Sequence, residues 1–568
     1  MPLPTNRSAD CRYASFLAFL SLGLCASFQA VVASGLRRLP GDRGDTVLLN
    51  FLLEHSWQWL AGGGAAPAIW DPPIGFPMHG LLAHGDLLLG VAPLYWPWRA
   101  LGADPESAYA LWLMSVCIVN FAAMFVLLRR LFRVDAVAAG LGAWLFAFSN
   151  ALFAQIVHAQ LLTQFYALGA FSGAWTFFAE SPRDRRGERP DSARRAITCY
   201  ASCVVLQLWS GFYVGAFIAL ISCVAMASAL ARSTSRAVLA ARFRAHAMSL
   251  AIAALASAVL LAPLARHYLA ARAVSQRVGV GAGELRLPRL ASYFYMGPDN
   301  LLYGWTDAVP PFASLPEAHE QAIGLGLLTT SVLAFVAWRR RRSEATRIGV
   351  MVFVVLFVAL TGFPFGIRLW RIWYYTLPGL AAVRAVSRIG IFRMLPASIA
   401  VALFVSESRA RNGRRAWAAL VIALLCGVEQ LRRLPTYDAD HWRCEVAAIV
   451  RAVDPRFAAF HLLGDRFANF EALAVAQRSG VPTVNLEVGA FPTAWTPFDA
   501  QIRHDGRDPE RTPGGGDGVS AGAGNRSGAR AGDRRTGIPR RLRGPLNVRR
   551  SVPRLGRAAV LPYDRRAA

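Results

Sequence analysis

The segment AYALWLMSVCIVNFAAMFVLL (residues 108–128) decides the class of fold, because it carries no charged side chain along its whole length. A helix needs a run of about 20 apolar residues to cross the hydrocarbon core of a bilayer. The chain has 568 residues, of which 55% are hydrophobic, and further blocks of this kind recur along it. Its mean hydropathy of +0.35 is typical of a membrane protein. The sequence therefore predicts an all-α protein that crosses a membrane many times.

About eleven segments qualify as membrane-spanning helices by length and hydropathy. The first is Ser15–Ser34, which we expect to be retained as a span and not removed as a signal peptide. The others are residues 108–128, 135–152, 159–179, 197–210, 212–231, 247–266, 322–338, 348–366, 389–407 and 416–430. The stretch 197–231 also fits one long helix in place of two.

The arginines predict the orientation of these helices. The formal net charge is +26, and basic residues cluster in short loops between apolar blocks, for example at 129–133, 183–195, 339–342 and 409–415. Loops of this kind stay on the cytoplasmic side of the membrane. We therefore expect a cytoplasmic N-terminus and, after about eleven crossings, an extracytoplasmic C-terminus. Because this arrangement accounts for the positive charge, it argues against a nucleic-acid partner.

The composition divides the chain into successive regions. Residues 1–34 contain the N-terminal segment and first helix, 35–107 a first extracytoplasmic loop, and 108–430 the helical bundle. Residues 431–505 combine short strand and helix patterns and predict a small extracytoplasmic α/β region. Gly and Arg dominate residues 506–568, which predicts a disordered tail. A frameshift in a GC-rich gene would also produce such a tail.

Two aspartates stand at the start of the first extracytoplasmic loop. Asp42 and Asp45 precede an amphipathic helical segment, one face of which carries polar residues four apart. These polar residues are Thr46, Asn50, Glu54 and Gln58. A carboxylate at this place can act as general base toward a sugar hydroxyl or as ligand of a divalent metal. Asp45 is also placed to cap the helix, so one capping and one surface aspartate is the simpler interpretation.

The rest of the loop adds imidazoles, carboxylates and tryptophans. A Pro-rich turn, WDPPIGFPMHG (70–80), precedes LLAHGD (81–86), and His79 and His84 could shuttle protons or join Asp86 in binding metal. Aromatic rings stack on sugars but also anchor proteins at the bilayer interface, and both interpretations apply to the tryptophans. The candidate substrate-binding residues of the loop are Glu54, Trp57, Trp70, Asp71, His79, His84 and Asp86. The metal candidates are Asp45, His84 and Asp86.

Two further groups of candidate residues lie outside this loop. Arg384 and Arg388 are four residues apart, and hence on one face of a helix that enters the membrane. Such a pair of guanidinium groups can clamp a phosphate, although snorkelling to lipid head groups explains it equally well. His158 lies between two predicted spans together with Gln160 and Gln164. Polar side chains are costly there, which indicates a cavity.

These segments together resemble the GT-C superfamily of integral membrane glycosyltransferases. The resemblance rests on a first span followed by an outer loop with an early aspartate, the Trp-Asp-Pro-Pro turn and an aromatic, re-entrant stretch at Leu87–Trp98. PGLAAVRAVSR (378–388) and GVPTVN (480–485) are similar to segments of uncharacterised bacterial members and of YfhO-like proteins. The resemblance covers about residues 10–500.

The resemblance implies a GT-C-like bundle in a bacterial cytoplasmic membrane that transfers a sugar from a polyprenyl-phosphate donor to an envelope glycan, lipid or protein. It further implies an inverting reaction on the outer face, with Asp42 as base and with Arg384 and Arg388 on the donor phosphate. The cofactor stays open, and a divalent metal ion is the candidate. Two features depart from the family: Arg43-Gly44 separates the two aspartates, and Leu-Glu-Val follows GVPTVN where a Gly-Tyr-Ser stretch is expected.

Two other classes of function remain alternatives. A transporter of lipids or lipid-linked sugars needs polar groups deep inside several spans, whereas the predicted span interiors here are nearly uncharged. A non-catalytic envelope-assembly protein is the other alternative, and a disordered tail is compatible with it. The sequence shows no Walker, Rossmann, nucleophile-elbow or zinc-protease motif, so a nucleotide substrate on the cytoplasmic side is not indicated.

Overall fold

The computed structural model describes residues 6–62, 68–179, 190–275, 279–376, 379–411, 413–463, 467–493, 495, 554–555 and 558–563. The chain divides into two compact units. The larger unit comprises Met1–Ile69, Asp86–Arg266 and Val278–Glu445, and the smaller unit comprises Trp70–Gly85, His267–Arg277 and Val446–Ala568.

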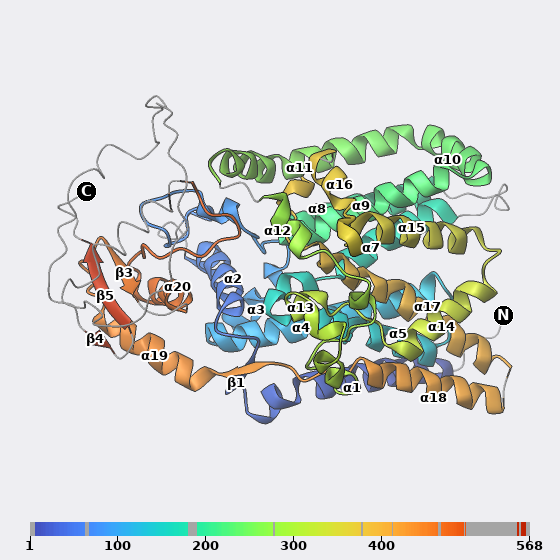
Figure 1. Ribbon diagram of the computed structural model, residues 1–568, viewed down its shortest axis with the longest axis horizontal. Helices are drawn as coiled ribbons and strands as arrows, with labels where there is room; N and C mark the ends of the chain where they lie inside the picture. The colour runs from blue at the N-terminus through green and yellow to red at the C-terminus, as the bar shows by residue number, and fades with distance from the viewer. Residues whose placement is uncertain are drawn as a thin grey trace. The chain divides into compact units, whose positions relative to one another are not determined.

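Helices dominate the chain (Figure 1). In its first half they are α1 (Asn6–Ala33), α2 (Asp45–Ala61), α3 (Trp96–Ala100), α4 (Pro105–Arg130), α5 (Ala136–Ala147), α6 (Asn150–Phe153), α7 (Phe165–Ala179), α8 (Pro190–Ser210), α9 (Phe212–Leu230), α10 (Ser233–Ala245) and α11 (Ala247–Val274). In its second half they are α12 (Val280–Leu285), α13 (Ala318–Gln321), α14 (Leu327–Arg339), α15 (Glu344–Leu360), α16 (Trp370–Thr376), α17 (Met394–Arg409), α18 (Arg414–Glu429), α19 (Ala439–Ala452) and α20 (Ala468–Ser479).

Six helical segments of the described residues are long and apolar enough to cross a membrane, and a seventh results if the bent pair α15–α16 counts as one span. They are Arg12–Ala33, Pro105–Arg130, Ala136–Phe153, Phe212–Leu230, Ala247–Val274 and Val386–Arg409. The chain therefore has the length and composition of a multi-pass membrane protein. Part of the difference from about eleven predicted spans comes from α14, an apolar helix of only 13 residues. Residues 197–231 form two helices, α8 and α9, that meet at Gly211.

Helix α5 forms the centre of the larger unit. Its sequence, AVAAGLGAWLFA, is apolar on every side, and a helix of this kind is stable only when neighbours surround it. It packs against α1, α4, α17 and α18. Gly142 lets two of these neighbours approach closely, because a Cβ there would lie 2.7 Å from Leu128 of α4 and 3.0 Å from Ala402 of α17.

Two strands of the larger unit hold the start of the first loop in place. β1 (Arg38–Pro40) pairs antiparallel with β2 (Thr436–Asp438), and the Gly41 amide donates to the carbonyl of Pro435 at 2.8 Å. The loop then enters α2, whose buried side packs against the 3-10 turn η4 (Ile156–Leu162). Segments far apart in sequence thus meet at the N-terminal end of α2. The aromatic stretch Leu87–Trp98 forms short turns and leads into α3.

The smaller unit contains a three-stranded antiparallel sheet in the order β3 (Ala459–Leu463), β5 (Ala558–Tyr563), β4 (Arg554–Leu555). The Pro-rich turn contacts the GVPTVN segment here, since the amides of Gly75 and Phe76 donate to the carbonyls of Asn485 and Thr483, each at 3.0 Å. Apart from β4 and β5, the tail expected to be disordered lies outside the described residues.

Candidate functional site

Asp42 closes the N-terminal turn of α2. Its Oδ1 accepts hydrogen bonds from the amides of Gly44 (3.1 Å) and Thr46 (3.3 Å), and its own amide donates to Thr46 Oγ1 at 3.1 Å. The capping role expected for Asp45 therefore belongs to Asp42. Gly41 adopts a φ of +105°, and a Cβ there would lie 2.0 Å from Thr46 Oγ1, so this turn requires glycine. Asp42 stays exposed, and its Oδ2 accepts no hydrogen bond from the described residues.

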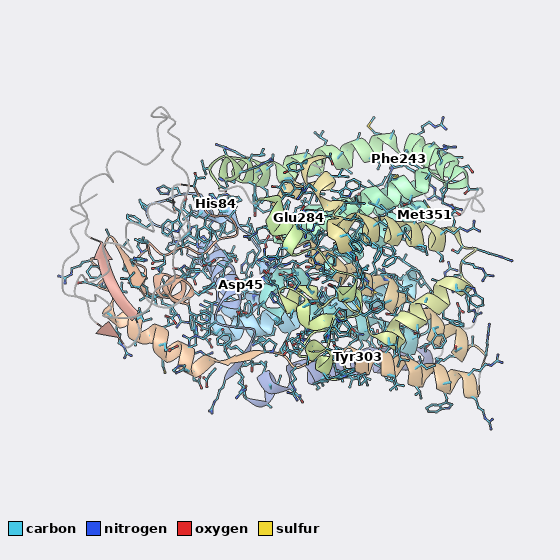
Figure 2. The ribbon with its side chains drawn as sticks, in the orientation of Figure 1. Asp45, His84, Phe243, Glu284, Tyr303 and Met351 are labelled. Atoms are coloured by element: carbon cyan, nitrogen blue, oxygen red, sulfur yellow. The ribbon has the colours of Figure 1, made fainter. Side chains whose placement is uncertain are left out.

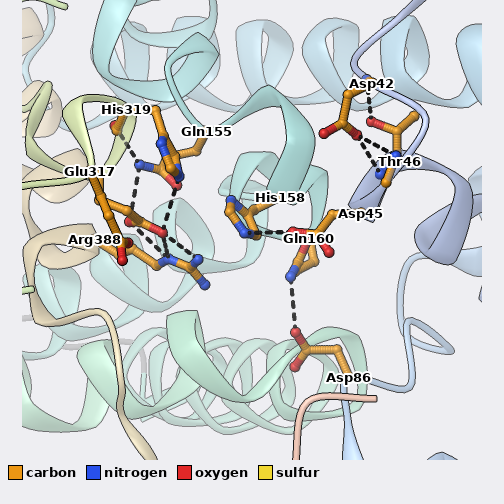
Figure 3. Close-up of polar contacts among 12 residues, drawn as sticks. Asp42, Asp45, Thr46, Asp86, Gln155, His158, Gln160, Glu317, His319 and Arg388 are labelled. Carbon is orange, nitrogen blue, oxygen red and sulfur yellow. Dashed lines mark hydrogen bonds and ion pairs between the residues drawn. The ribbon is translucent and has the colours of Figure 1, made fainter. Parts of the chain in front are cut away.

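Asp45, the first residue of α2, turns toward η4 instead. Its Oδ2 lies 3.0 Å from His158 Nε2, and a dashed line marks this contact in Figure 3. Burial raises the pKa of the Asp45 carboxyl, but the hydrogen bond with His158 and the charges of His158, Arg388 and His319 outweigh it and hold the pKa below its usual value of 3.8. Asp45 is thus an ionised carboxylate beside an imidazole.

Helix α13 brings a second imidazole and a second carboxylate to the same place. The rings of His158 and His319 stack with centroids 6.0 Å apart. One ligand atom from each of His158, His319 and Glu320 can be chosen so that all three lie within 4.8 Å of one another. Gln155 tethers α13, since its Nε2 donates to the carbonyl of His319 at 3.1 Å. Four side chains from three chain segments, counting Asp45, therefore form one polar cluster.

Arg388 neutralises Glu320. Its Nε lies 3.0 and 3.1 Å from the two carboxylate oxygens, and its Nη2 lies 2.5 Å from Oε1. Both side chains are buried. The guanidinium also lies over the ring of Tyr213, 4.9 Å from its centroid. The structure thus brings Arg388 to the cluster that contains Asp45 and His158. The side chain of Arg384 makes no hydrogen bond or ion pair with the described residues, and its backbone amide donates to Tyr213 Oη at 3.0 Å.

The cluster has the chemistry of a metal site. Two imidazoles and two carboxylates suit Zn²⁺ or Mn²⁺, and the buried Nδ1 of His158 has no partner among the described residues. Burial lowers the pKa of His319 below 6.5. Burial opposes ionisation of Glu320 as well, but Arg388 reverses its effect and lowers the pKa of the carboxyl below 4.5. Near neutral pH, His319 and Glu320 are therefore in the protonation states in which they bind a metal.

Asp86 lies at the margin of this cluster. Its Oδ1 accepts from the amide of Phe212 (2.9 Å), the first residue of α9, and its Oδ2 accepts from Gln160 Nε2 at 3.2 Å. Burial raises its pKa above the usual 3.8. Both carboxylate oxygens of Asp86 already accept hydrogen bonds. Asp86 could therefore act as the expected metal ligand only if these hydrogen bonds were broken.

Two other candidates of α2 lie away from the cluster contacts. Glu54 is buried, accepts from Arg99 Nε at 2.7 Å and Nη2 at 3.0 Å, and accepts from Tyr95 Oη at 2.8 Å. These contacts attach α2 to α3. Trp57 is half-buried on the same helix. Contact with a substrate by either residue remains a prediction.

The remaining candidates belong to the smaller unit. His84 Nδ1 lies 3.0 Å from both the Ala490 carbonyl and Ser275 Oγ, and burial lowers its pKa. Asp71 Oδ1 accepts from the Gly80 amide at 2.7 Å and lies 3.4 Å from the exposed His79. Trp70 stacks on His267 with centroids 4.0 Å apart. Figure 2 labels His84 and Asp45; they belong to different units.

His319 and Glu320 did not emerge from the sequence. They lie in AHEQ, a four-residue helix, and neither the spacing nor the composition of that segment is distinctive. Their only sequence signal is an adjacent His-Glu pair in a segment predicted to lie between spans. Their partners Asp45 and His158 lie far away along the chain, so the cluster exists only after folding.

No protein-family model matches the chain, and no curated protein does. Similar solved structures include the oligosaccharyltransferase AglB from Archaeoglobus fulgidus, in complex with an inhibitory peptide and a dolichol-phosphate. It is 14% identical, with a TM-score of 0.49, and the match covers 83% of this chain and 64% of that one. The arabinofuranosyltransferase AftD from Mycobacteria is 14% identical, with a TM-score of 0.47 and coverages of 86% and 32%.

ArnT from Cupriavidus metallidurans is 12% identical, with a TM-score of 0.43, and 88% of each chain is covered. The chain spans 58% of the length of the apo oligosaccharyltransferase from Archaeoglobus fulgidus. At identities of this size the likeness says nothing about substrates, so the function has to be inferred from the residues of the site.

Proposed function

We propose that the chain is a membrane glycosyltransferase that moves a sugar from a polyprenyl-phosphate donor to a glycan, lipid or protein of the cell envelope. The supporting observation is the cluster of Asp45, His158, His319 and Glu320 with Arg388. Side chains that can hold a metal ion, together with a guanidinium group, can stabilise the negative charge of a phosphate leaving group. We further propose a reaction on the outer face of a bacterial cytoplasmic membrane.

Each residue has a proposed role. Asp42, whose Oδ2 is exposed and unpaired among the described residues, accepts the proton of the acceptor hydroxyl. Asp45, His158, His319 and Glu320 would hold a divalent cation, which supplies positive charge for the leaving phosphate. Arg388, with Arg384 nearby in sequence, binds the same phosphate. Holding donor and acceptor together contributes much of the rate.

The smaller unit carries four further substrate-binding candidates. Trp70, Asp71, His79 and His84 stay substrate-binding candidates, since a stacked indole and the His79–Asp71 pair suit a polar, ring-shaped acceptor. We also retain about eleven crossings as the proposed topology. The short apolar helices, with α14 as the example, would then supply the crossings beyond those that reach full length.

The test is an in-membrane assay that offers radiolabelled polyprenyl-phosphate sugars to the wild type and to Asp42→Asn, Asp45→Asn and Arg388→Gln. We expect each substitution to reduce transfer by at least about a hundredfold, the size that loss of a general base or of a preorganised charge produces. Asp454→Asn is the matched control, because Asp454 pairs with Arg456 on the surface, and transfer should stay unchanged.

An Asp42→Asn protein with full activity would refute the role of Asp42. A wild type that binds lipid-linked sugar normally but transfers none of it would refute the enzyme and favour a transporter or an assembly protein.

A further inference from the structure

A group of arginines in the larger unit, which the proposed reaction does not use, is not fully neutralised. Glu284 of α12 is buried and pairs with Arg368 (Nη1 to Oε2, 2.9 Å) and with Arg371 (Nε to Oε1, 2.9 Å). Arg286 pairs with Glu317 at 2.6 Å. The guanidinium of Arg289 makes no hydrogen bond or ion pair with the described residues.

Arg289 lies close to Arg368. Its guanidinium lies against Gly362, where a Cβ would be 2.5 Å from Nη1, and Gly362 is at the base of the turn that leads to Arg368. The Phe363 amide closes that turn by donating to the Ile367 carbonyl at 3.1 Å. Burial and the charge of Arg368 lower the pKa of Arg289. Glycine at 362 therefore leaves the space that the Arg289 guanidinium occupies.

This group of residues has positive charge and N–H donors left over with which to bind an anion. Four guanidinium groups, including that of Arg289, face only the carboxylates of Glu284 and Glu317, which leaves a surplus of two positive charges. In addition, the buried Nε of Arg368 has no hydrogen-bond partner among the described residues. Guanidinium groups with free N–H donors bind phosphate through charge-assisted hydrogen bonds.

The surroundings identify the kind of phosphate. Helix α15 and the segment Pro364–Thr376 are bent by 90°, so this segment lies along the membrane surface if α15 crosses it. It exposes Phe365, Ile367, Ile372 and Tyr375. Apolar and aromatic side chains exposed next to arginines are typical of the head-group layer of a bilayer. Glu284 and α16 can be located in Figures 1 and 2.

We propose that Arg289 and Arg368, together with Gly362, form a binding site for the phosphate of an anionic phospholipid of the bilayer. The exposed apolar side chains of residues 364–376 would contact its acyl chains. Among the described residues, neither Arg289 nor Arg368 makes a hydrogen bond or ion pair with Glu320 or Arg388. The proposal therefore does not depend on sugar transfer.

The test measures lipid binding by the full-length protein in detergent. Soluble dihexanoyl phosphatidylglycerol, dihexanoyl phosphatidylcholine, inorganic phosphate and a polyprenyl phosphate are titrated, with thermal stabilisation and native mass spectrometry as readouts. We expect phosphatidylglycerol to bind at least about tenfold more tightly than phosphatidylcholine, because only it carries net charge. Arg289→Gln should weaken its binding about tenfold, and the double variant with Arg368→Gln should abolish it.

Arg347→Gln is the matched control, because Arg347 is an exposed arginine at the other end of α15, and binding should stay unchanged. Should Arg289→Gln not fold, Arg289→Lys keeps the charge but loses the two-pronged geometry and should show intermediate binding. Equal phosphatidylglycerol binding by the wild type and the double variant would overturn the site. Equal stabilisation by inorganic phosphate, or displacement of the lipid by the polyprenyl phosphate at equal concentration, would overturn the phospholipid as its occupant.

Discussion

At the scale of the residue, Glu320 faces two competing partners. Both of its carboxylate oxygens contact Arg388, yet the same carboxylate belongs to the group with His158 and His319. Metal binding at Glu320 must therefore weaken its ion pair with Arg388. We predict that Arg388→Gln binds Zn²⁺ more tightly than the wild type, by about tenfold, because the competing cation is gone.

Isothermal titration of purified protein with Zn²⁺ checks this. Arg384→Gln serves as control, because the side chain of Arg384 makes no hydrogen bond or ion pair with the described residues. The metal-free Arg388→Gln protein should also lose about 3–5 kcal/mol of stability, because Glu320 is then a buried charge without a partner. A weaker Zn²⁺ affinity in Arg388→Gln would show instead that Arg388 helps to form the metal site.

Asp104 supports a second prediction about a single residue. It caps α4, since its Oδ1 accepts from the Ser107 amide at 3.1 Å, and it pairs with Arg443 at 2.8 Å. Burial raises its pKa, but Ser107 and Arg443 outweigh burial and leave the pKa well below its usual 3.8. The stability it contributes is thus present above pH 3.8 and is lost as the pH falls further.

We expect Asp104→Ala to lower the free energy of unfolding by about 1 kcal/mol at pH 7. This is the usual contribution of an N-cap residue, and the half-exposed ion pair with Arg443 adds little to it. Thermal unfolding in detergent at pH 7 and at pH 3 measures the difference. The difference in unfolding temperature between the variant and the wild type should be smaller at pH 3 than at pH 7. A larger difference at pH 3 would contradict the assigned direction of the Asp104 pKa shift.

At the scale of the element, α5 depends on close packing more than on its own composition. Gly142→Ala should destabilise the protein by about 1–3 kcal/mol, since the added methyl group overlaps Leu128 and approaches the Ser398 carbonyl. Gly349→Ala of α15 is the matched control, because no atom lies within 4 Å of its Cβ position. It should leave stability unchanged or raise it by up to about 1 kcal/mol. Thermal unfolding followed by size-exclusion fluorescence distinguishes the two substitutions.

The elements also show where sequence patterns stop being informative. The apolar runs at 108–128 and 135–152 predict helices where α4 and α5 lie, because this signal is local. No local pattern predicts the polar cluster, because Asp45 and Glu320 come together only through the packing of α2, η4 and α13. Asp42, and not Asp45, caps the start of α2, across a turn in which Gly41 has a φ of +105°. Hydrophobic patterns do not report such backbone details.

At the scale of the whole molecule, the number of crossings depends on α14. This helix has 13 residues, about 20 Å at 1.5 Å per residue, so it spans the bilayer core only with help from its flanking residues. The arginines that follow it, Arg339–Arg342, favour a cytoplasmic end. If α14 crosses, residues 311 and 342 lie on opposite sides of the membrane.

We therefore predict opposite accessibility for an epitope tag inserted into the full-length chain after Pro311 or after Arg342, both of which are exposed. The first tag should bind antibody on intact spheroplasts, and the second only after permeabilisation. A tag after Arg411, in the basic loop between α17 and α18, provides the cytoplasmic reference because positive loops are retained inside. If both test tags were accessible from the same side, α14 would not cross, and the orientation of every later helix would have to be reversed.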